Sequence, residues 1–134
     1  MTAIKITSSS TIGSAAGLVG LKTCFSILDK WSVKAEEAWT VLGMKKAQYY
    51  KARKSLDSIS LSSDQIERIS YVLNIHQALR VVFTNPENVY GYMTMPNDNH
   101  FFNGDTPLSV TVSRGFAGLY DTYRHIDTLR GGGW

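Results

Sequence analysis

The stretch that decides the fold is SSDQIERISYVLNIHQALRVVF, which runs from Ser62 to Phe83. Ser62 and Gln65 occupy the two reciprocal positions of a capping box, so a helix is expected to begin here. Beyond the cap, apolar side chains cover more than half of the helix circumference: Ile66, Ile69, Val72, Leu73, Ile75, Ala78, Leu79, Val82 and Phe83. A helix with so many apolar sides is buried by several neighbours. We therefore expect a long central helix.

Two shorter helices joined by a tight turn are predicted upstream, after a first helix from Leu18 to Trp31. Ser32 is the expected N-cap of the second helix. Its apolar stripe at helical spacing consists of Ala35, Ala38, Trp39 and Leu42. Gly43 is expected to end it, and a third helix follows from Lys45 to Lys54. So short a link is typical of a helix-turn-helix, although Trp39 is large for the position where such helices cross.

The third helix is strongly basic, with five positive charges and no negative charge between Lys45 and Lys54. Helical geometry places Tyr49 and Ala52 on a buried side and most of the charge on the other. Lysines can neutralise phosphates, and a tyrosine can reach a phosphate or a base edge. The residues expected to bind DNA are Lys45, Lys46, Tyr50, Lys51 and Lys54. The alternative is a solvated surface helix without a nucleic-acid partner.

Three further helices are predicted after the central one, and no convincing strand pattern is present. Asn85-Pro86 precedes a short helix from Glu87 to Met95, and Thr106-Pro107 begins another that ends at Ser113. The last helix, from about Gly115 to Leu129, has its apolar face made of Phe116, Leu119, Tyr120, Tyr123, Ile126 and Leu129. Its other face holds Asp121, Arg124, His125 and Thr128. The expected class is all-α.

Length and composition are those of an ordinary globular chain, with 134 residues, a formal net charge of +3 and one cysteine. A flexible arm is expected over residues 1–17, a helix-turn-helix domain over 18–60 and a second helical domain over 61–134. A single thiol, Cys24, cannot form an internal disulfide, which fits a reducing compartment. No run of about 18 apolar residues predicts a membrane span. We therefore expect a cytoplasmic protein.

The sequence contains no group of residues typical of a catalytic or metal site. His76, His100 and His125 are widely separated, and the pair Asp121–His125 is more simply explained as a surface contact. Cys24 lies on an apolar helix and is expected in the core. No enzyme activity, metal or cofactor is expected.

The chain ends in Arg130-Gly131-Gly132-Gly133-Trp134, which is more than a helix cap requires. Three glycines give a slender backbone that can enter a narrow cleft, while Trp134 is a large anchor and Arg130 a planar cation. One interpretation is a probe inserted into a pocket of a partner protein. The other is a frayed tail, or Trp134 folded back on its own core.

From about Leu61 onward the chain resembles the toxin-binding domain of Xre/MbcA/ParS-like antitoxins. The residues that match include the stretches 65–75, 78–80, 85–86, 96–97, 102–104, 106–108, 123–127 and 130–134. The segments Leu42-Gly43-Met44 and Tyr49-Tyr50-Lys51 look like the Xre-type helix-turn-helix of the same family.

The resemblance implies an antitoxin that neutralises a cognate toxin encoded by the adjacent gene. That toxin would be of the RES, ParT or MbcT type, which consumes NAD or has an ADP-ribosyltransferase-like fold. On this chain the toxin-binding residues would be Arg130, Gly131, Gly132, Gly133 and Trp134, with Phe101, Phe102 and Asn103 shaping the same surface. Members of the family tend to form homodimers within larger toxin–antitoxin complexes and to repress their own operon at operator DNA. The alternative is a stand-alone Xre-type transcriptional regulator.

Overall fold

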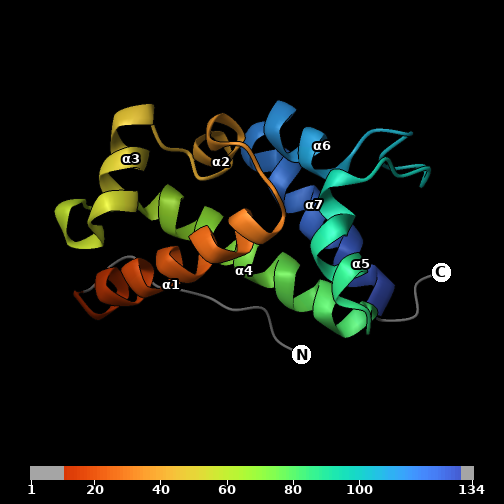
Figure 1. The fold of residues 1–134 in the computed structure, drawn as a ribbon, viewed down its shortest axis with the longest axis horizontal. Coiled ribbons are helices and arrows are strands. Elements are labelled where there is room, and N and C mark those ends of the chain that lie inside the picture. The colour runs from red at the N-terminus through yellow and green to blue at the C-terminus, as the bar shows by residue number, and fades with distance from the viewer. Residues whose placement is uncertain (1–10, 131–134) are drawn as a thin grey trace.

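The computed structural model describes residues 11–130, and all of the regular structure in this range is helical (Figure 1). The α-helices are α1 (Thr11–Lys30), α2 (Ala35–Val41), α3 (Lys46–Lys54), α4 (Ser63–Val82), α5 (Pro86–Gly91), α6 (Pro107–Ser113) and α7 (Gly115–Arg130). Two 3₁₀ turns, η1 (Leu56–Ser58) and η2 (Tyr92–Thr94), follow α3 and α5. The expected all-α class is confirmed.

Helix α4 is the centre of the molecule, as its apolar pattern predicts. The capping box at its start is present: the Gln65 amide N–H donates to Ser62 Oγ over 3.1 Å, and the Ser62 N–H donates to Gln65 Oε1 over 3.0 Å. Helix α1 crosses α4 on one side and α7 packs against it on another (Figure 1). The side chains of α4 that these neighbours bury include Ile66, Ile69, Val72, Ile75, Ala78 and Leu79.

One hydrophobic core extends across both parts of the chain that the sequence divides at residue 60. Trp31 is 2% exposed and Tyr49 is 4% exposed, and both belong to the same cluster of buried side chains as Ile75 and Ile126. The two predicted domains therefore share one hydrophobic core, to which α4 contributes. Within the described range, no helix has the length and apolarity needed to cross a membrane.

The first helix begins at Thr11 and not at Leu18, so residues 11–17 of the expected flexible arm are helical; the rest of that arm lies outside the described residues. Glycine makes this part of the helix hard to see in the sequence, because it contributes nothing to an apolar pattern. Its role is steric: a Cβ atom on Gly17 would lie 3.3 Å from side-chain carbons of both Ile66 and Leu61. The missing side chain lets α1 approach the start of α4 closely.

Ser32 does not cap α2, contrary to the sequence prediction, because it ends α1 instead. Its φ is +62°, and its N–H donates to the Asp29 carbonyl while the Val33 N–H donates to the Leu28 carbonyl. These two bonds form a Schellman ending, which satisfies the last carbonyls of a helix. The N-cap of α2 is Lys34, whose N–H donates to the Glu37 side chain.

Gly43 forms a second Schellman ending, at the turn between α2 and α3. Its φ is +68°, and the N–H groups of Gly43 and Met44 donate to the carbonyls of Thr40 and Trp39. A Cβ atom at this position would lie 2.8 Å from Arg68 Nε. Arg68 cannot easily move away, because it is paired with Asp64 and donates to the Val41 carbonyl. The turn therefore requires glycine for both its backbone angle and its lack of a side chain.

We expect Gly43→Ala to destabilise the protein by more than the roughly 1 kcal/mol that left-handed backbone costs an alanine. The excess comes from the displaced Arg68 side chain, so Arg68→Ala in the same chain should recover part of it. Gly104→Ala is the matched control, since Gly104 has a φ of +89° but nothing within 4 Å of its added Cβ. Urea unfolding measures all three; equal losses at both glycines would contradict the steric argument.

Candidate DNA-binding and partner-binding surfaces

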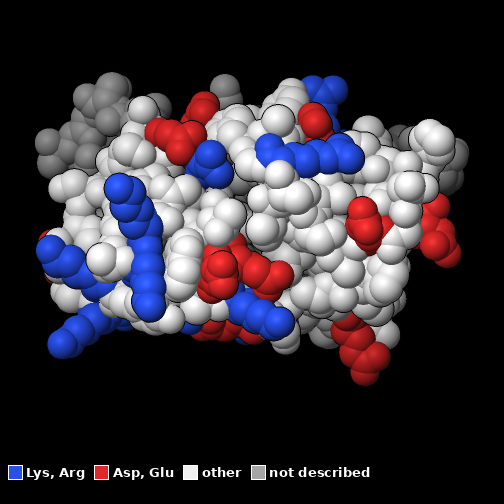
Figure 2. Space-filling view, turned by 90° about the horizontal axis from the view of Figure 1, so that it is seen from above, with Lys and Arg blue, Asp and Glu red and all other residues white. Residues whose placement is uncertain are grey.

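Helix α3 presents a basic face to solvent. Tyr49 and Ala52 are buried, with 4% and 1% exposure, so the opposite side of the helix faces solvent. The predicted DNA-binding residues Lys45, Lys46, Tyr50, Lys51 and Lys54 are all exposed. Figure 2 shows Lys and Arg side chains gathered at the left-hand end of the molecule's upper face, where α3 lies. None of the four lysines forms an ion pair with another residue of the described range.

The large Trp39 side chain is accommodated where α2 meets α3. Its ring lies 5.8 Å from the ring of Tyr49 and 5.9 Å from that of Tyr50, both in edge-to-face geometry. Such aromatic pairs add to the stabilisation from burial. The two helices thus meet through aromatic rings rather than through a small residue. One consequence is that Tyr50, although 50% exposed, has its ring orientation supported from α2.

A pair of glutamine side chains fixes the position of α3 relative to α4. Gln65 Nε2 donates to Gln48 Oε1 over 2.9 Å, and Gln48 Nε2 donates to Gln65 Oε1 over 3.2 Å. Gln65 Nε2 also donates to the Gly43 carbonyl over 3.0 Å. Gln65 is only 8% exposed, so these bonds replace those it would make with water. The sequence reveals Gln65 as a capping residue but does not reveal this tie to the turn.

Arg53 is the one cation of α3 that is turned away from the basic face. Its guanidinium forms an ion pair with Asp29 of α1 and lies 4.7 Å from the centre of the Phe25 ring. The hydrogen bond that Arg53 donates to the Asp29 carboxylate raises the pKa of Arg53 above its usual value. Arg53 thus fastens α3 to α1, and the exposed charge of α3 comes from its lysines.

The second candidate surface contains the loop between η2 and α6, which is closed by its own hydrogen bonds. The Asn97 N–H donates to the Asp105 carbonyl, and the Gly104 N–H donates to the Asn97 carbonyl over 2.8 Å. Asn97 Nδ2 donates to the hydroxyl of Tyr92, and Asn99 Oδ1 accepts from the Phe101 N–H. Residues 97–105 thus form an internally hydrogen-bonded unit despite having no regular structure.

This loop is attached to α7 by ring stacking. The rings of Phe101 and His125 lie 5.3 Å apart and nearly parallel, at 10°, while the guanidinium carbon of Arg114 lies 5.7 Å from the centre of the Phe101 ring. His125 therefore contacts the loop, whereas the sequence placed it on the outer face with Asp121. Burial lowers the pKa of His125, and its Nε2 has no hydrogen-bond partner in the described part of the chain.

The predicted toxin-binding residues differ in their exposure. Asn103 is exposed and Phe101 is half-buried, so both can be reached by a partner. Phe102 is 1% exposed and packs against His125, so it supports the loop from inside and cannot itself touch a partner. Arg130 is half-buried and paired with Asp127 at the end of α7. Residues Gly131, Gly132, Gly133 and Trp134 lie outside the described residues.

No family model matches the chain. It is 31% identical over 113 residues to a protein of Sinorhizobium fredii named as uncharacterized protein y4oB, with 84% of each chain covered. The chain belongs to the y4oB family. That name states no activity. The features of this y4oB relative that bear on its function are the two surfaces described above.

Two further titratable side chains of this y4oB relative, Cys24 and His76, pack against other parts of the fold. Cys24 is fully buried, and desolvation raises the pKa of its thiol. The ring of His76 stacks on that of Tyr90, with 5.5 Å between the ring centres. The pKa of His76 is lowered mainly by burial and further by the positive charges of Arg80 and Lys30. Within residues 11–130, no three His, Cys, Asp or Glu side chains are grouped closely enough to hold a metal ion.

The stacked histidine predicts a pH dependence of stability. Because burial lowers the pKa of folded His125 below the 6.5 of an unperturbed histidine, the unfolded chain binds more protons as the pH falls below 6.5. The free energy of unfolding is therefore highest above this pH and decreases between 6.5 and the lowered pKa. His125→Phe keeps a stacked ring without a titrating nitrogen and should reduce this slope, leaving the share of His76. Urea unfolding across the range measures it; an unchanged slope would count against the burial of His125.

Proposed function

We propose that this protein is the antitoxin of a toxin–antitoxin pair, which neutralises a toxin with one surface and binds operator DNA with another. The main support is the arrangement of the two surfaces. The lysine face of α3 and the unit formed by residues 97–105 with the end of α7 lie toward opposite ends of the molecule (Figure 1). A protein with such a layout can bind DNA and a protein partner at the same time.

The DNA-binding part of the proposal rests on charge and on support. Duplex DNA is bound mainly through phosphate neutralisation, and the four lysines are exposed with no acidic residue on α3. A helix that reads DNA must also be held rigidly, and α3 is tied to α1 by Arg53 and to α4 by Gln48. We further propose that the protein forms a homodimer, in which two copies of α3 would contact a two-fold operator and repress the operon.

The toxin-binding part rests on the internally hydrogen-bonded loop and on the resemblance to Xre/MbcA/ParS-like antitoxins. The proposed contact surface contains Phe101, Asn103, Arg130 and the segment 131–134, with Phe102 as its internal support. Because the loop that holds Phe101 and Asn103 is already closed by its own hydrogen bonds, ordering these two residues on binding costs less conformational entropy. The tail would enter the active-site cleft of a RES, ParT or MbcT type toxin and exclude its substrate NAD.

Deleting residues 131–134 is expected to abolish neutralisation without changing the fold. The test is growth of cells that co-express the chain with the product of the adjacent gene, together with co-purification of the complex. Trp134→Ala should weaken the complex about 30-fold, as expected for an interface anchor worth about 2 kcal/mol. Lys51→Glu is the control and should protect cells as well as the natural chain does. Equal protection by the truncated chain would contradict the occluding tail.

Lys51→Glu is expected to weaken binding to the DNA upstream of the gene by about tenfold or more at 0.1 M salt, because a phosphate contact becomes a repulsion. Arg80→Glu makes the same change in charge in the last turn of α4, far from α3, and serves as the control. Fluorescence anisotropy with the upstream duplex and a scrambled duplex gives both affinities. Equal effects of the two substitutions would argue against α3 as the DNA-binding helix.

A stand-alone transcriptional regulator is the second candidate, and the exposed lysine face of α3, which has no ion pair within residues 11–130, is the observation that favours it. Such a protein would bind operator DNA in the same way but would form no complex with the adjacent gene product. The co-purification experiment separates the two candidates directly.

A further inference from the structure

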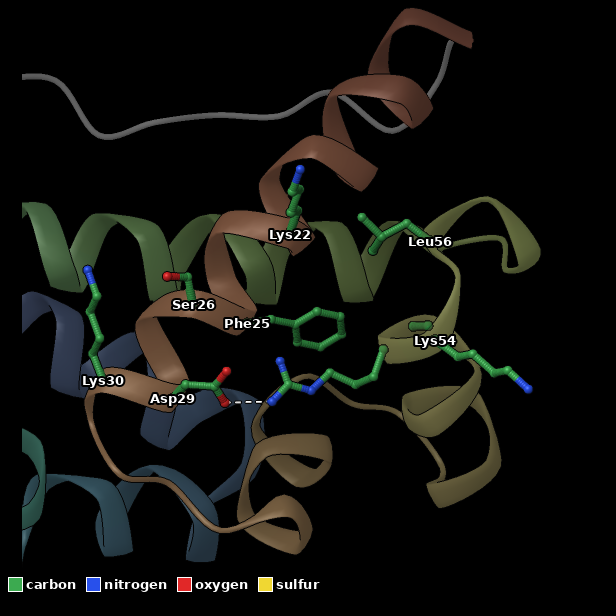
Figure 3. Close-up of a pocket in the computed structure, with 9 residues that line it drawn as sticks. Lys22, Phe25, Ser26, Asp29, Lys30, Lys54 and Leu56 are labelled. Atoms are coloured by element: carbon green, nitrogen blue, oxygen red, sulfur yellow. Dashed lines mark hydrogen bonds and ion pairs between the residues drawn. The ribbon is translucent and has the colours of Figure 1, made fainter.

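The basic surface of α3 continues into an open groove between α3 and α1, shown in Figure 3. The groove has a volume of about 570 Å³ and is lined by side chains that include Lys22, Phe25, Ser26, Arg53, Lys54 and Leu56. Lys54 belongs both to this groove and to the exposed face of α3. The two features are therefore parts of one continuous surface.

Among the described residues, Asp29 is the one carboxylate that lines the groove, and it is already paired with a cation. Asp29 is paired with Arg53, as the dashed line in Figure 3 shows, and the Arg53 guanidinium is held over Phe25. A third lysine of the lining, Lys30, lies 5.3 Å from the centre of the Tyr90 ring. Of the cations that line the groove, Lys22 and Lys54 have no partner among the described residues.

The shape of the groove favours an extended ligand over a compact one. Its floor is closed by Phe25 and Ala52, which are 6% and 1% exposed. Lys22 and Lys54 stand on its two sides and point away from each other, so they do not converge on one small anion (Figure 3). Charges spaced along an open surface match a chain of phosphates. Asp57, exposed on η1 beyond Leu56, limits this surface on one side.

We propose that the groove binds the phosphate backbone of the same DNA duplex that α3 contacts, with Lys22, Ser26 and Lys54 as its ligands. This inference rests on the proposed DNA-binding function and extends it from α3 to α1. Lys22 and Lys54 each neutralise a phosphate, and the Ser26 hydroxyl donates to a phosphate oxygen. Such contacts position the protein on the duplex without reading its sequence.

The test is the salt dependence of DNA binding by the full chain, measured by fluorescence anisotropy with the upstream duplex and a scrambled duplex of equal length. The logarithm of the binding constant falls linearly with the logarithm of the salt concentration. Lys22→Gln should make this negative slope shallower by about 0.9, the value for one phosphate contact. If the variant and the natural chain bind equally at 1 M salt, this difference in slope makes the variant bind about eightfold more weakly than the natural chain at 0.1 M salt. Both duplexes should lose affinity by the same factor.

Arg80→Gln is the matched control, because it removes the same charge from an exposed side chain in the last turn of α4, outside the lining of the groove. It should leave the slope unchanged. Equal slopes for Lys22→Gln and the natural chain would overturn this inference alone, and so would equal decreases for Lys22→Gln and Arg80→Gln. Failure of the natural chain to bind either duplex would overturn the proposed DNA-binding function together with this inference. Thermal unfolding of each variant verifies that the fold is intact.

Discussion

The reciprocal amide pair between Gln48 and Gln65 is the constraint on which the arrangement of the molecule depends. Gln65 is at once the capping residue of α4, the partner of α3 and a donor to the Gly43 carbonyl in the turn. Its side chain therefore joins three backbone segments with one amide group. Because Gln65 is nearly fully buried, an alternative arrangement of α3 would leave its Nε2 group without the Gln48 and Gly43 acceptors, at a cost of about 1–3 kcal/mol.

Polar contacts of this kind add direction to a core that is otherwise apolar. Hydrophobic burial around α4 brings the helices together but does not choose their rotation, because it depends on area more than on geometry. Arg68, Gln65 and Arg53 each form a hydrogen bond from one helix to another part of the chain, at Val41, Gly43 and Asp29. These three contacts surround the α2–α3 unit. The lysine face of α3 is consequently presented in one orientation.

The 97–105 loop is attached to α7 in a different way, because aromatic stacking takes the place of a hydrogen bond between them. His125 contacts Phe101 with its face and Phe102 with its edge, so one ring holds two consecutive aromatic residues of the loop. The buried Nε2 atom of His125 gains no hydrogen bond in the described chain. Packing, rather than hydrogen bonding, therefore attaches the loop to α7.

The sequence by itself determined the helices, the capping box at Ser62 and the outward direction of the α3 lysines, because these follow from local spacing and from one helix at a time. It could not show that residues 11–17 are helical, since glycines leave no apolar pattern there. It also placed His125 outside and counted Phe102 as a contact residue, because packing against a loop distant in sequence has no period. Only the tertiary structure paired Arg53 with Asp29 and brought Lys22 beside α3. Such contacts depend on which helices become neighbours, and that is decided by burial of the whole core.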